Sequence, residues 1–220
     1  MREGQPFFRV DWVVDNLDVL ARRIGEQLYV TAIAVTVGFL LSFGLALLIR
    51  RYPRAYAPVL AVAGVMYAIP SIALFVLLIP ITGLSLLTAE IALVSYTMVI
   101  LVRNIVAALR AVPADVLEAA SGMGYSSGQR LWRVELPIAL PIIVAGVRLA
   151  TVTTMGLVTI ATLIGSGGLG YLIVNIGINQ RFPTATLVGV VLVVLLSALL
   201  DAGLALLQRA LTPWAKARAG

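Results

Sequence analysis

The sequence predicts an all-α membrane protein with about five transmembrane helices, preceded by an amphipathic N-terminal helix. Of the 220 residues, 61% are hydrophobic and only 12% are charged, whereas soluble domains carry about 25% charged residues. Three uncharged runs, 27–49, 55–89 and 149–180, each exceed the roughly 20 residues that a helix needs to cross a bilayer. These observations exclude a soluble enzyme, a disordered chain and a fibrous protein.

Residues 1–26 form the predicted N-terminal segment, and its amphipathic pattern extends over 7–28. Apolar side chains recur at steps of three and four residues, while acidic side chains take another face. We expect a helix that lies in the membrane interface with Trp12 at headgroup depth. An ordinary helix packed against the bundle remains the alternative. The apolar positions are Val10, Val13, Val14, Leu17, Leu20, Ile24 and Leu28.

One transmembrane domain, 27–210, follows this segment, and a short tail, 211–220, ends the chain. The 35-residue uncharged run holds more than one element, with a turn at Pro80-Ile81-Thr82-Gly83. The predicted spans are 27–49, 56–79, 86–109, 138–163 and 184–208.

The distribution of basic residues predicts the orientation. The loops at 80–85 and 164–183 hold only Arg181, whereas ten of the sixteen basic residues fall on the opposite side. The positive-inside rule makes that opposite side cytoplasmic. The N-terminus is then outside the cell and the C-terminal tail is cytoplasmic. The ten residues are Arg50, Arg51, Arg54, Arg103, Arg110, Arg130, Arg133, Arg209, Lys216 and Arg218.

The loop between the third and fourth spans, residues 110–137, is far longer than a helix connection requires. Pro113 suits the first turn of a helix and Gly124 suits its end. Ser126 or Ser127 can cap a second short helix. Small and apolar side chains with one acid on the first helix predict a docking surface for a cytoplasmic partner protein. These residues are Leu117, Glu118, Ala119, Ala120 and Met123.

The same loop reads Glu118-Ala119-Ala120, three residues, Gly124, nine residues, Val134, one residue, Leu136-Pro137. This pattern resembles the EAA loop of ABC importer permeases, which has isoleucine where this sequence has Val134. The resemblance implies a methionine-permease-like fold, with Glu118–Gly124, Leu136 and Pro137 coupling to a cytoplasmic ABC ATPase dimer. It also implies a second permease subunit, identical or paralogous, and an extracellular or periplasmic substrate-binding protein.

No chemistry of its own is expected from this chain. It contains no cysteine, no histidine and no P-loop pattern, so we expect no catalytic residue and no metal site. ATP and magnesium are expected in the partner ATPase, and the excess of basic residues indicates topology and lipid contact, not nucleic-acid binding. Gly165–Gly170 fits the GxGxxG pattern, but it follows a helical run instead of a strand. We interpret it as a tight external bend before an apolar segment, 171–178.

The fourth span carries a comparatively polar face, because four of its residues recur at steps of three and four. Arg148 would lie roughly 15 Å into the membrane, and ionisable groups at such depth usually face a bundle interior or a wet cavity. The face is predicted to line a translocation pathway. A structural ion pair, with Asp201 as the candidate partner, remains the alternative. The residues are Arg148, Thr151, Met155 and Thr159.

Pro70 interrupts the second predicted span and frees a backbone carbonyl. Ser71 adds a hydroxyl, and Tyr67 one turn earlier can contact a cation. Broken helices at mid-membrane often border a substrate path, so these three residues are predicted to border it. A simple proline kink is the alternative.

Two further stretches, 67–74 and 161–170, resemble the osmoprotectant permeases. The resemblance implies ATP-driven import of a quaternary ammonium compound such as glycine betaine, carnitine or choline across a bacterial or archaeal cell (inner) membrane. Methionine permeases share a similar glycine-rich stretch, so an amino-acid importer is the alternative. An ion-coupled carrier would require buried acids, and the spans offer only Glu90 and Asp201, both near span ends. If the chain were only a structural membrane adaptor, we would expect the fourth span to have no polar face.

Overall fold

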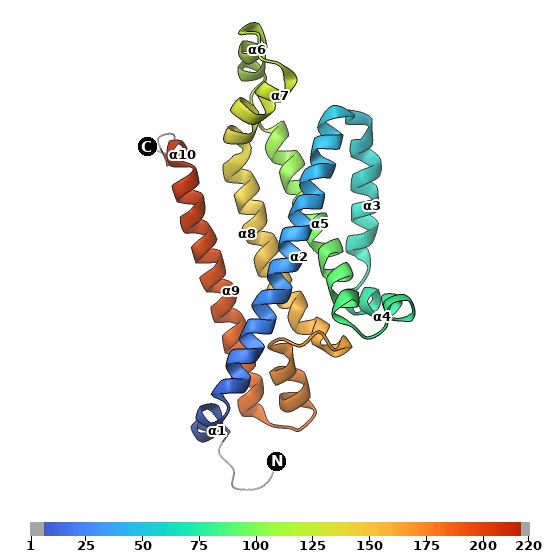
Figure 1. Ribbon diagram of the computed structural model, residues 1–220, viewed down its shortest axis with the longest axis vertical. Coiled ribbons are helices and arrows are strands. Elements are labelled where there is room, and N and C mark those ends of the chain that lie inside the picture. Colours follow the sequence, from blue (N-terminus) through green and yellow to red (C-terminus); the bar gives the residue numbers. More distant parts are fainter. Residues whose placement is uncertain (1–6, 217–220) are drawn as a thin grey trace.

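The structure is a computed structural model that describes residues 7–216, in which every regular element is helical (Figure 1). Residues 1–6 of the N-terminal segment and 217–220 of the tail lie outside the described residues. The helices are α1 (Val10–Asp15), α2 (Leu17–Arg51), α3 (Tyr56–Ala68), α4 (Ser71–Thr82), α5 (Leu86–Arg110), α6 (Ala114–Gly122), α7 (Ser127–Arg130), α8 (Leu136–Ala161), α9 (Pro183–Leu211) and α10 (Pro213–Lys216). Shorter helical turns are Pro53–Ala55, Leu131–Glu135, Thr162–Ile164 and Leu172–Ile178.

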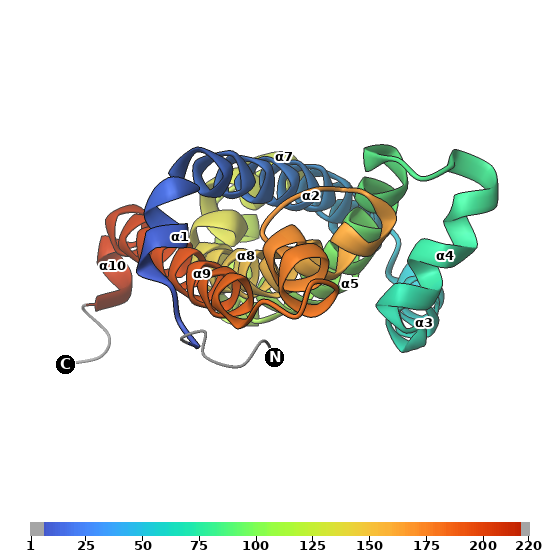
Figure 2. The same ribbon diagram turned by 90° about the horizontal axis from the view of Figure 1, so that it is seen from below.

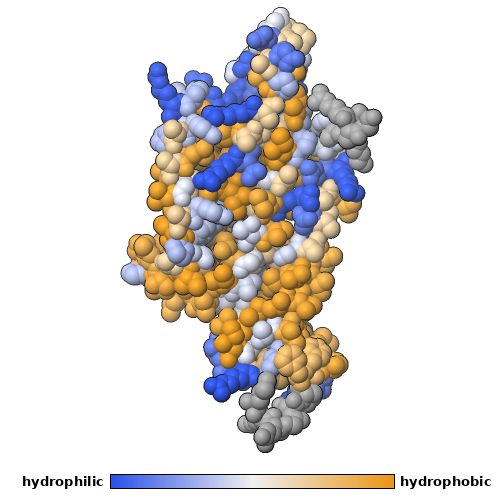
Figure 3. All heavy atoms as spheres, turned by 180° about the vertical axis from the view of Figure 1, so that it is seen from behind, coloured by the Kyte–Doolittle hydropathy of each residue, from blue (hydrophilic) through white to orange (hydrophobic). Residues whose placement is uncertain are grey.

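Four helical segments of the described chain are long and apolar enough to cross a membrane, and the bent pair α3–α4 raises the number to five. This agrees with the five predicted spans. Hydrophobic residues cover most of the face seen in Figure 3, and hydrophilic residues gather toward the end that carries α6. α6 and α7 lie at one end of the molecule, and α1 lies at the other (Figure 1).

The predicted amphipathic helix over 7–28 is not a single element. It breaks at Asn16, whose side-chain amide donates a hydrogen bond to the Trp12 carbonyl at 2.8 Å and so competes with a continuing helix. α1 packs on the start of α9, where the Trp12 and Phe182 rings meet edge to face at 5.2 Å. The remaining residues belong to α2, which begins ten residues earlier than the predicted span. At roughly 52 Å, α2 is longer than a bilayer core is thick.

The second predicted span is a broken pair. α3 and α4 are inclined at 97° to each other, and Figure 2 shows both on the side of the molecule opposite α9. Ile69 is extended (φ −71°, ψ 126°), as the residue before a proline tends to be. The Tyr96 hydroxyl donates a hydrogen bond to the Ile69 carbonyl. The predicted interruption at Pro70 is confirmed, and the second span is a bent pair of helices, the second of which ends at Thr82.

α5 is the centre of the bundle and packs against α2, α3, α4 and α8. Glycines let the backbones approach at two crossings. A Cβ at Gly38 of α2 would lie 2.7 Å from the Thr97 side chain, and one at Gly146 of α8 would lie 2.7 Å from Asn104. α9 packs mainly on α8 and on the 172–178 turn, so much of its surface is exposed.

Candidate coupling site and translocation path

The predicted docking residues divide between the surface and the interior of α6. Glu118, Ala119 and Met123 are exposed, and Met123 has 68% of its surface accessible. Leu117 is half-buried, whereas Ala120 is buried and faces inward. A partner protein can therefore reach one acid between small and apolar side chains, while Ala120 fixes the helix to its own subunit.

The bend after α6 has the chemistry that the sequence predicts. Gly124 has φ +81°, and its N–H donates to the Ser121 carbonyl at 3.0 Å. Ser126 then caps α7: its hydroxyl accepts from the Gln129 backbone N–H, and the Gln129 side chain accepts from the Ser126 backbone N–H. This reciprocal pair is a capping box. The structure thus contains the two short helices expected in the loop.

Leu136 and Pro137 are part-buried and lie in the first turn of α8, away from the exposed surface of α6. A π-helical turn, Leu131–Glu135, precedes them and joins α7 to α8. From Ser127 to Ile164 the chain runs as one helical rod of 38 residues. These two residues therefore shape the base of the loop, and their predicted part in coupling stays a prediction.

A buried ionic cluster that the sequence motifs do not indicate ties the loop to α2. Glu135 accepts two hydrogen bonds from Arg50, Nε to Oε2 and Nη2 to Oε1, both at 2.7 Å. Arg130 Nε donates to the same carboxylate at 3.1 Å. The available signal was an acid inside the basic, mostly apolar 130–137 stretch, on the predicted side of Arg50.

Arg148 pairs with Asp201, as the alternative interpretation of the polar face requires. Arg148 Nε and Nη2 each donate to one carboxylate oxygen of Asp201 at 2.8 Å, and Nη1 donates to Gln208 at 3.2 Å. Gln208 in turn donates to the Pro141 carbonyl at 2.9 Å. This network joins α8 to α9 within the hydrophobic region, where such pairs stabilise helix association.

Thr151 and Met155, which were predicted to line the pathway, are buried inside the subunit in this structure. Met155 has none of its surface accessible; its Sδ accepts from the Thr31 hydroxyl at 3.2 Å and its carbonyl accepts from the Gln27 amide at 2.8 Å. Thr151 is buried and donates to its own helix, and Thr159 is half-buried and donates to the Met155 carbonyl at 3.1 Å. The polar face is satisfied inside the subunit. The exposed stripe of α8 is a different one: Ile142, Ala145, Leu149, Val152 and Gly156.

The residues at the α3–α4 bend are accessible. Tyr67 has 56% of its surface exposed, Pro70 is exposed and Ser71 is half-buried. They lie together at the corner between the two helices. Unlike Met155, they can contact a solute or another subunit without any change inside this chain.

The glycine-rich bend is held by the start of α2. Gly167 and Gly168 have φ of +78° and +81°, a conformation that glycine adopts without strain. Glu26 accepts from the Gly168 N–H and Gln27 accepts from the Leu169 N–H, both at 3.0 Å. The bend is therefore clamped in place, and Glu26 and Gln27 are functional candidates that the sequence patterns did not reveal.

A helical bundle of four or five spans, with a two-helix loop at one end and a clamped bend at the other, defines a membrane-spanning transport subunit. Residues 28–213 match the family described as "Binding-protein-dependent transport system inner membrane component". The chain belongs to this family and is a permease subunit of an ABC importer.

Relatives and solved structures agree with this assignment. The osmoprotectant import permease protein OsmW of Salmonella typhimurium is 38% identical over 209 residues, 93% of this chain and 97% of the relative. The glycine betaine/carnitine/choline transport system permease protein OpuCB of Bacillus subtilis is 33% identical, covering 88% and 89%. A chain of the MetNI methionine ABC transporter in an inward-facing conformation is similar in fold, with a TM-score of 0.83 and 26% identity over 90% of this chain and 98% of that one.

Proposed function

We propose that this permease subunit carries a small quaternary ammonium osmolyte, such as glycine betaine, carnitine or choline, across a bacterial or archaeal cell membrane. The supporting observation is that relatives named for these compounds align with nearly the whole chain. The chain works with a second permease subunit, identical or paralogous, and with an external substrate-binding protein. An amino-acid cargo such as methionine is the second candidate, because the MetNI structure shares the fold.

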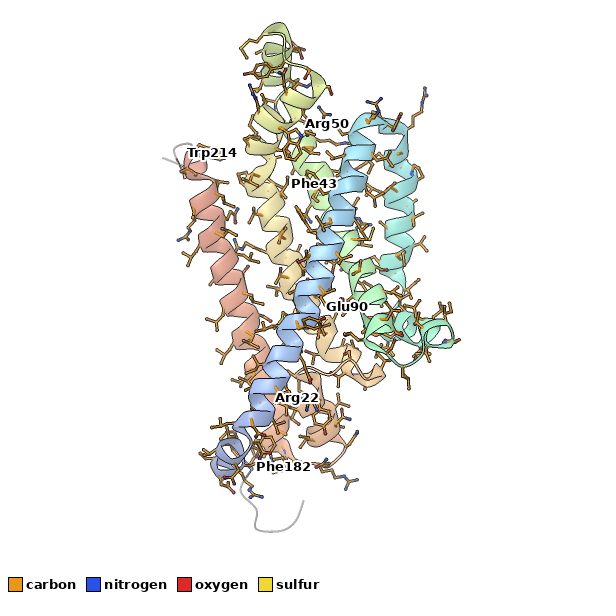
Figure 4. The ribbon with its side chains drawn as sticks, viewed as in Figure 1. Arg22, Phe43, Arg50, Glu90, Phe182 and Trp214 are labelled. Atoms are coloured by element: carbon orange, nitrogen blue, oxygen red, sulfur yellow. The ribbon has the colours of Figure 1, made fainter. Side chains whose placement is uncertain are left out.

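The exposed surface of α6 is the contact for an ABC ATPase dimer, which binds ATP and magnesium. Glu118 supplies a charged contact, and Ala119 and Met123 allow close apolar approach. Arg50, Arg51 and Arg54 lie toward the same end of the molecule as α6 (Figure 4 labels Arg50). This supports a cytoplasmic position for α6, and hence an external N-terminus and a cytoplasmic tail.

The 127–164 rod gives the ATPase a mechanical route into the membrane. A displacement of α6 reaches α8 directly, because α7, the π-helical turn and α8 form one continuous helix. Tyr67, Pro70 and Ser71, exposed at the α3–α4 bend, border the path at the interface with the second subunit. Arg148 and Thr159 lie farther along α8, where Arg148 is satisfied by Asp201.

Transport by the purified assembly tests this proposal. The chain is reconstituted in liposomes with its ATPase and binding protein, and uptake of labelled glycine betaine, carnitine, choline and methionine is measured with and without internal ATP. We expect ATP-dependent uptake of one or more quaternary ammonium compounds. Methionine uptake alone would transfer the assignment to the second candidate, and uptake independent of ATP would contradict the importer mechanism.

A further inference from the structure

The side chain of Glu135 is the meeting point of three elements. Only 5% of Glu135 is exposed. Arg50 from the last turn of α2 donates a hydrogen bond to each carboxylate oxygen at 2.7 Å, and Arg130 from α7 donates to one of them at 3.1 Å. Bidentate guanidinium–carboxylate pairs fix direction as well as distance. The triad therefore defines the angle between α2 and the rod that begins at α7.

Hydrogen bonds extend the triad to the end of α6. Arg130 Nη1 donates to the Ser121 hydroxyl in the last turn of α6 at 3.0 Å. Arg50 Nη2 also donates to the Ser127 carbonyl at 3.1 Å. A connected path of polar contacts thus runs from α2 through Glu135 to the helix that presents the docking surface.

Apolar packing covers one side of this path, where Ile49 of α2 and Leu131 of the loop belong to the same buried hydrophobic cluster. On the other side a cleft of about 660 Å³, partly open to the surface, lies between α2, α5 and the loop, and Arg50, Arg130 and Glu135 all line it. Apolar side chains do not pack across this cleft, so the directional hydrogen bonds of the triad help to set the geometry here. An aromatic contact between the same elements, Phe43 with Trp132 at 6.5 Å between ring centroids, lies about two helical turns along α2 from Arg50.

Covalent continuity makes the link to α2 distinctive. The loop is continuous in sequence with α5 and α8, so both must follow when α6 moves. α2 has no such connection, since 62 residues separate the end of α2 at Arg51 from the start of α6 at Ala114. Arg50 makes four hydrogen bonds to the loop, two to Glu135 and two to Ser127.

We propose that Glu135 is a positioning residue for energy coupling: through Arg50 and Arg130 it holds α6 at a fixed angle to α2, so that the ATPase moves α2 together with α8. This inference rests on the proposed function, because it assigns the route by which the α6 displacement enters the bundle. Glu135 touches neither substrate nor ATPase in this role.

The test measures ATP hydrolysed per substrate molecule imported, in liposomes that contain the whole transporter. Glu135→Gln keeps the side-chain shape but leaves two guanidinium groups without their carboxylate. We expect this ratio to rise at least about fivefold, the lower end of ordinary coupling between sites, while ATP hydrolysis continues. Arg50→Lys, which keeps the charge and loses the bidentate fork, is expected to change the ratio in the same direction.

Matched controls separate positioning from general stability. Trp132→Leu removes the aromatic contact between the same elements and is expected to leave the ratio unchanged. The exchange Arg50→Glu with Glu135→Arg restores an opposite-charge pair and is expected to recover part of the coupling. Where Glu135→Gln does not assemble, Ser121→Ala serves instead, because it removes the hydrogen bond from Arg130 to α6 and leaves the Glu135 pairs intact; the only other bond lost is the one that the Ser121 hydroxyl donates to the Leu117 carbonyl within α6.

A distance measurement gives a second readout. The chain contains no cysteine, so spin labels at Arg54→Cys and Asp115→Cys report the separation of the α2 end from α6. We expect one narrow distribution with Glu135 and a broad one with Glu135→Gln. An unchanged ratio and an unchanged distribution in that variant would overturn the inference. Wild-type protein without ATP-dependent uptake would instead defeat the proposed function.

Discussion

Single residues in this subunit are held by polar partners that lie far away in the sequence. Gln27 accepts from the Leu169 N–H and donates to the Met155 carbonyl, so one side chain of α2 fixes both the glycine-rich bend and α8. Arg148 is matched to Asp201 across 53 residues. In a membrane, unsatisfied polar groups are expensive, and these pairings explain why the polar side chains are tolerated.

Gly168→Ala tests the clamped bend. The backbone at this position has φ +81°, and an added Cβ would lie 2.6 Å from the Gln27 side-chain oxygen. Positive φ in a residue other than glycine costs about 1–3 kcal/mol, and the Gln27 hydrogen bond to Leu169 must shift as well. We expect a lower unfolding temperature of the detergent-solubilised protein. Gly156→Ala, at a helical position where a Cβ meets nothing within 4 Å, is the control and is expected to remain as stable as wild type.

Arg148→Ala tests the ion pair between α8 and α9. The change leaves the Asp201 carboxylate facing apolar helices without its guanidinium partner, so we expect less folded protein in the membrane and reduced transport. The double variant Arg148→Met with Asp201→Leu removes both charges and is expected to recover much of the folded protein. Recovery of folding without recovery of transport would indicate that Arg148 also serves the pathway, whereas an unaffected single variant would remove it from both roles.

At the scale of elements, local chemistry was predictable from sequence and burial was not. Gly124, Ser126 and Pro70 act through their own backbone or near neighbours, so the bend, the capped α7 and the broken second span follow from residue type. The burial of Met155 depends on Gln27 and Thr31, more than 120 residues earlier. A polar stripe on a helix looks the same whether it faces water or polar partners on another helix. The ion pair of Glu135 could not be predicted for a similar reason, since its partner Arg50 lies 85 residues away in the sequence.

Glu118→Ala tests α6 as the docking element. Loss of one charge-assisted contact costs about 1.5–3 kcal/mol, which corresponds to a roughly tenfold or greater loss of affinity for the ATPase. Co-purification of the ATPase and ATP-dependent uptake are the measurements. Asp115→Ala, an exposed acid one turn earlier on the same helix, is the control and is expected to change ATPase binding less. Normal co-purification and uptake with Glu118→Ala would count against the docking role.

At the scale of the whole molecule, the arginines near the α6 end predict which way the subunit faces. Because the chain has no cysteine, a single exposed substitution such as Ser121→Cys reports the side of the membrane by its reaction with an impermeant thiol reagent. We expect labelling only after the cells are opened, and labelling of Gln180→Cys in intact cells. The reverse pattern would invert the orientation and remove α6 from the reach of a cytoplasmic ATPase.

α2 and the 127–164 rod are joined at two levels, by Arg50 and Glu135 near α6 and by the hydrogen bond from Gln27 to the Met155 carbonyl nearer the glycine-rich bend. Two helices that are joined at two levels do not separate easily at one end alone, so we expect them to tilt together as one rigid body. We therefore expect access to the cargo to alternate through rotation of one whole subunit against its neighbour. Uncoupled leak of cargo through the transporter should accordingly rise when either of these two contacts is removed, even though neither contact touches the cargo.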